Sequence, residues 1–169
     1  MLPGGVPRTS IPLRERPWDW LFVVGFALFA TTSLTFDSLA GLNIDLRAST
    51  FPTAPLLVLY GTAIDPLVLA NPPYLAFMSA LSAFVMGPYY LFAIYAVVRG
   101  RDWIKVPALV HASCMSYSLV VHIAMEFLDR WPPANTAAML ATYLPYAAIP
   151  LAFAIRTRHE HPFTHANVG

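Results

Sequence analysis

The sequence predicts an all-α polytopic membrane protein, a bundle of four transmembrane helices with kinks in some of them. Of its 169 residues, 57% are hydrophobic and only 11% are charged, whereas roughly a quarter are charged in an ordinary soluble domain. The charged residues are also bunched, which leaves long segments without charge, four of which are predicted to span the membrane. Because lipid offers no hydrogen-bond partner to backbone N–H and C=O groups, we expect each segment to be helical.

The four charge-free segments are residues 21–36, 66–98, 106–125 and 131–155. The last three reach the roughly 20 residues that a helix needs to cross about 30 Å of hydrocarbon. The first is shorter, but Trp18 and Trp20 at its start are typical of a membrane interface. It also has an alternative interpretation as a signal peptide, with Arg14 and Arg16 before an apolar core and small residues at 38–40 after it. We expect a retained span, because an acidic residue directly precedes those small residues.

The positions of Lys and Arg predict the orientation of the bundle. One side of a four-span arrangement holds eight basic residues, namely Arg8, Arg14, Arg16, Arg99, Arg101, Lys105, Arg156 and Arg158. The other side holds only Arg47 and Arg130. Cytoplasmic loops carry the basic excess, so both termini are expected to be cytoplasmic. The predicted organisation is a tail over 1–16, a membrane domain over 17–156, and a polar, mobile tail over 157–169.

Composition and motifs exclude several other classes. The net charge of +1 is not the basic excess that is typical of nucleic-acid-binding domains. The single cysteine, Cys114, cannot form an internal disulfide. No nucleotide-binding glycine loop, nucleophile elbow or HExxH helix occurs, so hydrolysis and phosphoryl transfer have no support. His159, His161 and His165 lack cysteines or paired carboxylates nearby, so we expect a solvated tail and no metal site. No cofactor is expected.

Two acidic residues stand at the edge of predicted hydrocarbon, where ionisable groups are costly and therefore candidates for function. Asp37 ends the first apolar segment, and Asp65 directly precedes Pro66 at the start of the second. Both should lie at the non-cytoplasmic end, where an ionised carboxylate would suit a cationic amine. The alternatives are a water-facing helix end for Asp37 and an N-cap for Asp65. The connection between them contains a short apolar stretch, residues 52–60, expected to be interfacial or re-entrant.

The third segment carries a polar stripe made of His111, Met115, Ser118, His122 and Glu126. These residues recur at three- and four-residue intervals, so they share one face of a helix, which should face the bundle interior. The last two could exchange a proton with a ligand, or they could only form hydrogen bonds between helices.

The second and fourth segments supply tyrosines and prolines. Tyr143 and Tyr146 could offer hydroxyl groups to a ligand. Pro88, Pro145 and Pro150 could kink their helices and so open a cavity for a lipid-like molecule. Proline is, however, also frequent in membrane helices in general.

Several stretches together resemble the EXPERA-domain family, which includes the sigma-2 receptor and the emopamil-binding sterol isomerases. They are residues 34–37 (LTFD), 65–67 with 72–73 (DPL and PP), 95–108 (YAVVRGRDWIKVPA) and 143–150 (YLPYAAIP). The likeness spans roughly residues 17–156 and is closest to the sigma-2 receptor branch, whose members have four spans and cytoplasmic termini.

The resemblance implies a hydrophobic cavity that takes sterols or amphipathic amines, in a protein of the endoplasmic reticulum. It implies that Asp37 contacts the ligand amine, that Asp65 supports the site, and that the two tyrosines of the fourth span lie near the cavity. The ligand-binding residues that we predict are Asp37, Asp65, Ser82, His111, Ser118, Tyr143 and Tyr146.

The chain also departs from the family pattern. Members usually carry a glutamate in the second span, but residues 78–83 contain no carboxylate, and the first span lacks the histidine and glutamate of the isomerases. We therefore expect a non-catalytic membrane protein that binds a sterol or another hydrophobic or amphipathic ligand within its helix bundle, with a role in sterol homeostasis or trafficking. The alternatives are a sterol (Δ8–Δ7) or terpenoid double-bond isomerase using Asp37, His122 and Glu126, and a purely structural protein. The expected partners are membrane lipid and the ligand, and the sequence leaves open a homodimer or a larger membrane partner.

Overall fold

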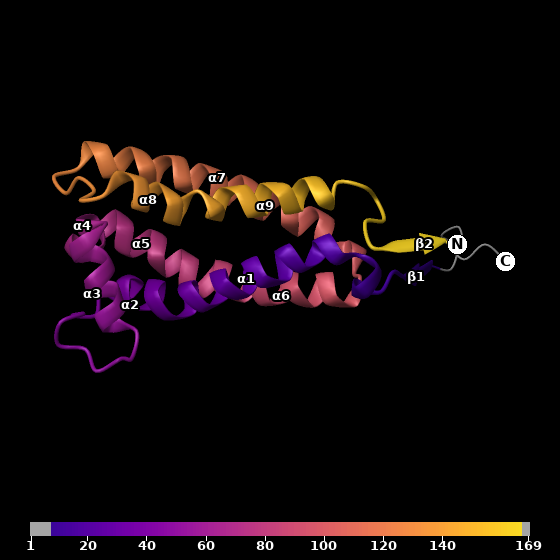
Figure 1. Cartoon of the computed structure of the whole chain (residues 1–169), viewed down its shortest axis with the longest axis horizontal. Coiled ribbons are helices and arrows are strands. Elements are labelled where there is room, and N and C mark those ends of the chain that lie inside the picture. Colours follow the sequence, from indigo (N-terminus) through magenta and orange to yellow (C-terminus); the bar gives the residue numbers. More distant parts are fainter. Residues whose placement is uncertain (1–7, 167–169) are drawn as a thin grey trace.

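Four helical segments run side by side along one long axis, and each is apolar and long enough to cross a membrane (Figure 1). The computed structural model describes residues 8–166. The four segments are Pro17–Gly41, Pro73–Arg99, Asp102–Leu128 and Thr136–Arg156. They correspond to the four predicted spans, and they confirm the all-α membrane fold.

Each of three spans is assembled from consecutive helical pieces, whereas the third is nearly all one helix. The first contains α1 (Trp20–Thr32), a π-helical turn (Ser33–Asp37) and α2 (Ser38–Gly41). The second contains α5 (Pro73–Leu81), a π-helical turn (Ser82–Met86) and α6 (Gly87–Arg99). The third is α7 (Lys105–Leu128), after a short 3-10 turn (Asp102–Ile104), and the fourth is α8 (Thr136–Tyr143) followed by α9 (Pro145–Arg156).

The predicted prolines lie at or near the breaks in these spans. Pro145 begins α9 directly after α8 ends, and Pro88 lies in the first turn of α6, just beyond the π-helical turn. Proline cannot donate the backbone hydrogen bond that would continue the preceding helix, so it favours a break or kink at these positions. Pro150 lies inside α9, where it removes one backbone hydrogen bond.

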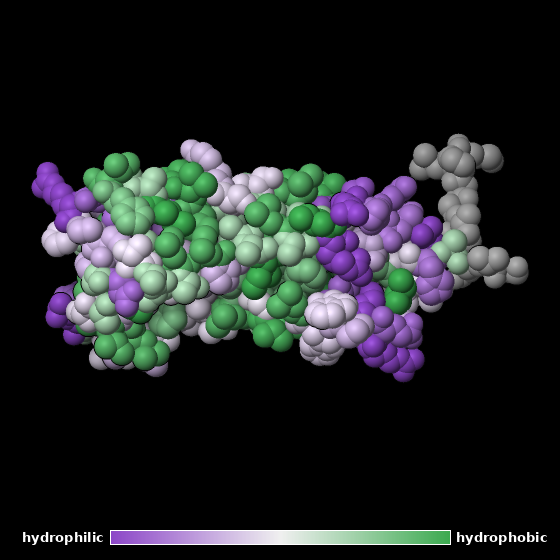
Figure 2. Space-filling model, turned by 45° about the horizontal axis from the view of Figure 1, so that its top comes forward, coloured by the Kyte–Doolittle hydropathy of each residue, from purple (hydrophilic) through white to green (hydrophobic). Residues whose placement is uncertain are grey.

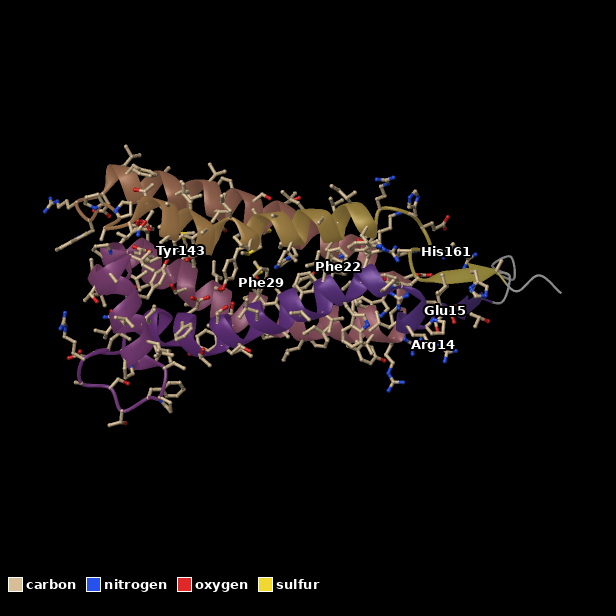
Figure 3. All side chains as sticks on the ribbon, viewed as in Figure 1. Arg14, Glu15, Phe22, Phe29, Tyr143 and His161 are labelled. Carbon is tan, nitrogen blue, oxygen red and sulfur yellow. The ribbon has the colours of Figure 1, made fainter. Side chains whose placement is uncertain are left out.

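Aromatic rings fill one half of the bundle between α1, α6 and α9. Phe26 is fully buried and lies 5.0 Å from Phe153 and 5.7 Å from Tyr90, measured between ring centroids. Phe22 and Phe29 extend this cluster along α1 (Figure 3). The first apolar segment therefore supplies much of the core, as a retained span would.

The outside of the bundle is apolar around its middle, where many leucine, valine and phenylalanine side chains are exposed. Hydrophilic residues gather at the two ends (Figure 2). Trp18 and Trp103 are also exposed, near the ends of their spans. Such a band between polar ends is the surface that a bilayer requires.

Two short helices close the end of the bundle at which Asp37 and Asp65 lie. They are α3 (Ala54–Ala63) and α4 (Pro66–Ala70). The first of them is too short to span, as predicted for residues 52–60.

The described parts of the two tails pair with each other, so the predicted mobility of the second tail is wrong for these residues. Strand β1 (Arg8–Ser10) is antiparallel to β2 (Thr164–Ala166). Phe163 is fully buried, and the guanidinium groups of Arg16 and Arg156 lie over its ring, at 4.6 and 5.0 Å from the centroid. Burying this aromatic ring fixes a segment that is otherwise polar. Residues 1–7 and 167–169 of the predicted tails lie outside the described residues.

His161 is likewise not free in solvent, because its Nδ1 atom lies 3.3 Å from Oδ2 of Asp102. That carboxylate also accepts a hydrogen bond from the backbone N–H of Phe163 at 2.8 Å. The paired tails thus join the turn that precedes α7, and both described ends of the chain lie at one end of the bundle (Figure 1).

Candidate functional site

A cavity of about 470 Å³ lies in the half of the bundle opposite the paired tails. Its volume is within the range of small-molecule sites, roughly 300–1,000 Å³. All four spans and α3 contribute to its wall, which is mostly apolar with a few polar groups. The lining residues are Thr32, Phe36, Asp37, Ala40, Leu56, Leu57, Tyr60, Val68, Leu75, Met78, Ser79, Leu81, Ser82, Met86, Met115, Ser118, Leu119, His122, Thr142, Tyr143 and Tyr146.

Asp37 is presented to the cavity by the two π-helical turns, which lie against each other. Ser33 in the first turn and Ser82 in the second are joined by a hydrogen bond of 3.0 Å between their hydroxyl oxygens. The half-buried carboxylate of Asp37 lies beside both hydroxyls. A π-helical turn widens the helix locally and is frequent at functional sites. Here the paired turns place one carboxylate, supported by two hydroxyl groups, on an apolar wall.

Tyr146 covers the cavity on the side of the aromatic core. Its hydroxyl oxygen lies 2.6 Å from that of Thr32, and its ring stacks on Phe29 at 4.1 Å between centroids. The side chain is thereby fixed at both its apolar and its polar end.

Asp65 is fully buried, and both of its oxygens are used. Oδ1 accepts the backbone N–H of Leu67 at 3.1 Å, which caps α4, and this confirms the predicted N-cap. Oδ2 accepts the hydroxyl of Tyr143 at 2.5 Å. The carboxylate therefore lies behind Tyr143 and not on the wall.

The polar stripe of α7 faces the interior, as predicted. His122 lines the cavity, and its Nε2 atom lies 3.2 Å from Oε1 of Glu126, one turn further along. The ring of His122 also meets Tyr143 edge-to-face at 4.4 Å. Glu126 is fully buried behind the histidine. Together with Asp65 these residues bring two carboxylates and an imidazole to one place.

Tyr60 reaches the same end of the cavity from α3. Burial is the main cause that raises the pKa of its hydroxyl above the ordinary value for tyrosine. The group is therefore a neutral phenol that can donate or accept a hydrogen bond.

Five of the seven predicted ligand-binding residues line the cavity, namely Asp37, Ser82, Ser118, Tyr143 and Tyr146. Asp65 lies behind the wall, and His111 lies in the aromatic core, where it stacks on Tyr89 at 4.1 Å. His111 shares a helix face with His122 but precedes it by three turns, roughly 16 Å, so it lies beyond the cavity.

Four polar lining residues were not among the predicted ones: Thr32, Tyr60, Ser79 and Thr142. The sequence offered one indication for Tyr60, because it is the polar residue at the end of the short apolar stretch predicted to be interfacial. The other three are Ser and Thr residues in apolar helices. From the sequence, such residues cannot be told apart from Ser and Thr residues whose hydroxyl only forms a hydrogen bond to a backbone carbonyl of its own helix. Thr142 in fact makes such a bond, to the carbonyl of Ala138 at 2.9 Å.

Comparison with known proteins agrees with this architecture. The chain is 24% identical over 147 residues to "Sigma intracellular receptor 2" of Xenopus tropicalis, an alignment that covers 79% of this chain and 83% of that protein. No solved structure matches significantly. Residues 52–157, more than half of the chain, match the family described as EXPERA (EXPanded EBP superfamily). The chain therefore belongs to the EXPERA family, and its similarity to the Xenopus protein supports the sigma-2 receptor branch of that family.

Proposed function

We propose that this protein binds a sterol or another hydrophobic, amphipathic ligand within its helix bundle, without catalysing a reaction. The observation that carries the proposal is the apolar cavity of about 470 Å³ with a carboxylate, Asp37, on its wall. Apolar walls suit a ring system, and a few fixed polar groups suit one polar end of the ligand. The name of the Xenopus relative, an intracellular receptor, supports the same proposal.

The polar groups of the cavity favour a ligand with a hydroxyl or an amine. Tyr60, Tyr143 and Tyr146 offer hydroxyl groups, and Asp37 offers a negative charge. A cationic amine would pair with this carboxylate away from bulk water, where such a pair is stronger than at a surface. A neutral sterol would use hydroxyl groups instead. The two ligand classes therefore depend differently on Asp37.

We further propose an endoplasmic reticulum membrane protein with both termini in the cytoplasm. The eight basic residues of the tails and of the link between the second and third spans support this orientation. The described ends of the chain meet in one sheet, which agrees with an even number of spans.

The proposal is tested by binding to protein reconstituted in lipid nanodiscs. The probes are radiolabelled cholesterol and a tertiary amine with an aromatic tail. Asp37→Asn should weaken amine binding at least tenfold, or about 1.4 kcal/mol, and change cholesterol binding little. Asp45→Asn, on an exposed loop, is the matched control. Unchanged amine affinity in Asp37→Asn would remove this residue from the site.

A second pair of variants tests the cavity itself. Ser118→Phe would fill the cavity and should abolish binding of both probes. Ser113→Phe places the same ring on the exposed face of the same helix and should leave binding intact. Absence of saturable binding in the wild-type protein, or equal effects of the two substitutions, would contradict the proposal.

A second candidate function, a sterol double-bond isomerase, is favoured by the 3.2 Å contact between His122 and Glu126 at the cavity wall. Such a reaction adds a proton to one alkene carbon and removes another from an allylic carbon. His122 could deliver the first proton as an imidazolium and, once neutral, accept the second, which restores its starting state. Glu126 would lie behind it, and Asp37 would stabilise the cation. Conversion of a Δ8 sterol to its Δ7 isomer, followed by mass spectrometry, tests this function. No product from protein that binds cholesterol would exclude it.

A further inference from the structure

Asp65, His122 and Glu126 form a buried cluster whose charges are not balanced by any Lys or Arg among the described residues. One ligand atom of each lies within 4.8 Å of the others. All three residues are buried, with 0%, 6% and 0% of their surface exposed. Glu126 has an ion-pair contact with His122 at 3.2 Å, and Asp65 has no Lys or Arg partner in the described part of the chain. Two carboxylates in an apolar bundle without a counter-charge are costly.

Glu126 is the member of the cluster that most requires a partner. Neither of its carboxylate oxygens has a hydrogen-bond donor of good geometry among the described side chains, and the same holds for Nε2 of His122. Nε2 of His122 lies 3.2 Å from Oε1 of Glu126, and one ligand atom of each of these residues lies within 4.8 Å of one of Asp65. Buried polar atoms are nearly always paired, so the cluster lacks a component.

We propose that the missing component is a divalent transition-metal ion of the zinc class, held by Asp65, His122 and Glu126. Imidazole and carboxylate groups are ordinary zinc ligands, and three protein ligands with one open position are typical of sites that meet a small molecule. A divalent cation would cancel the charge of the two carboxylates. The site differs from the sterol site in its residues, and His122 alone touches both.

The geometry of the cluster supports a single ion. His122 and Glu126 are four residues apart on α7, a spacing that places two ligands on one face of a helix. In a tetrahedral site, ligand atoms about 2.0–2.2 Å from zinc lie about 3.3–3.6 Å apart. Nε2 of His122 and Oε1 of Glu126, at 3.2 Å, are close to this spacing. The ligand atom of Asp65 lies within 4.8 Å of the other two and would reach this spacing by side-chain rotation.

The groups around the cluster orient its ligands. Asp65 accepts hydrogen bonds from Leu67 and Tyr143, and the ring of Tyr143 holds the imidazole edge-to-face. Metal ligands are commonly fixed by such outer contacts. Because His122 lines the cavity, the fourth coordination position has a route to the cavity interior.

The test uses the full-length protein in detergent micelles, stripped with a chelator and given zinc ions alone. We expect elemental analysis to find one tightly bound zinc ion per chain. After cobalt has replaced zinc, we expect a visible absorption band that is typical of cobalt in a site of low symmetry. Glu126→Gln and His122→Gln keep side-chain size close to the original, and each should weaken zinc binding at least tenfold. Thermal unfolding of each variant verifies that it is folded.

Two controls separate this cluster from other histidines of the chain. His111→Gln removes a buried histidine of the same helix, and the triple variant H159Q/H161Q/H165Q removes those of the C-terminal segment. Both should retain one zinc per chain. A folded wild-type protein that binds no zinc would overturn the proposal. Equal zinc affinity in Glu126→Gln would overturn it as well. Neither result bears on cholesterol binding, which Ser118→Phe tests separately.

Discussion

The hydroxyl of Tyr143, at the end of α8, donates a hydrogen bond of 2.5 Å to Oδ2 of Asp65, at the start of α4. The two residues are 78 positions apart in the chain. Since the other oxygen of Asp65 caps α4, one carboxylate links the fourth span to the segment that leads into the second. This link closes the end of the cavity at which the polar groups gather.

Tyr143→Phe should therefore destabilise the bundle. The substitution keeps the ring but removes the donor to a buried carboxylate, and hydrogen bonds to charged groups contribute about 1.5–3 kcal/mol. Unfolding of the detergent-solubilised protein, followed by circular dichroism during titration with a denaturing detergent, measures the loss. Tyr117→Phe makes the same chemical change at a residue that is 72% exposed and should have no effect. Equal stability of the two variants would refute a stabilising role for this bond.

Gly41→Ala should destabilise the packing of the first span against the second. A Cβ at Gly41 would lie 2.6 Å from the backbone N and Cα of Ala80, so a helix backbone has to move. Overpacking of this kind costs about 1–3 kcal/mol. Gly25→Ala is the control, because its Cβ would meet the end of the Ile149 side chain at 3.0 Å, which can rotate away. A loss of thermal stability that is not larger in Gly41→Ala would contradict the close approach.

Asp19→Asn should loosen the opposite end of the molecule. Asp19 is buried and accepts hydrogen bonds from Arg156 at 2.9 and 3.1 Å, and it also pairs with Arg16. Its neutralisation leaves two guanidinium groups without their counter-charge, a loss of about 3 kcal/mol. Limited proteolysis of the C-terminal segment should become faster. Glu15→Gln, which removes an exposed charge paired only with Arg14, should leave the rate unchanged.

Labelling of single cysteines tests the topology. In a Cys114→Ser background, His159→Cys should react with a membrane-impermeant maleimide in sealed microsomes whose cytoplasmic face is outside. Thr50→Cys, in the loop at the other end of the bundle, should react only after permeabilisation. Both positions are exposed, so accessibility to solvent is matched. Reaction of both cysteines in sealed vesicles, or the reverse pattern, would contradict the orientation.

Local features of this protein follow from the sequence because their causes are local. Charge-free length predicts a span, the spacing of His111 to Glu126 predicts a stripe on one helix face, and an aspartate before proline predicts an N-cap. Contacts between distant residues leave no such pattern. Asp65 and Glu126 each stand out in the sequence, because they lie beside apolar segments where a charge does not serve solubility. Nothing in their spacing, however, predicts that they meet around His122. The burial of Phe163 could not be predicted for the same reason, since a polar segment gives no sign that two arginines pack over its one aromatic ring.

The sequence by itself determined that this is a four-span membrane protein, because the free energy of placing a helix in lipid depends mainly on the hydrophobicity, charge and length of that segment. It also determined which side chains have a large free-energy cost of burial. Only the tertiary structure decided which of these face the cavity, which pair with each other, and which lie in the core. The reason is geometric, since residues that share a helix face, such as His111 and His122, meet different neighbours once the helices kink and cross.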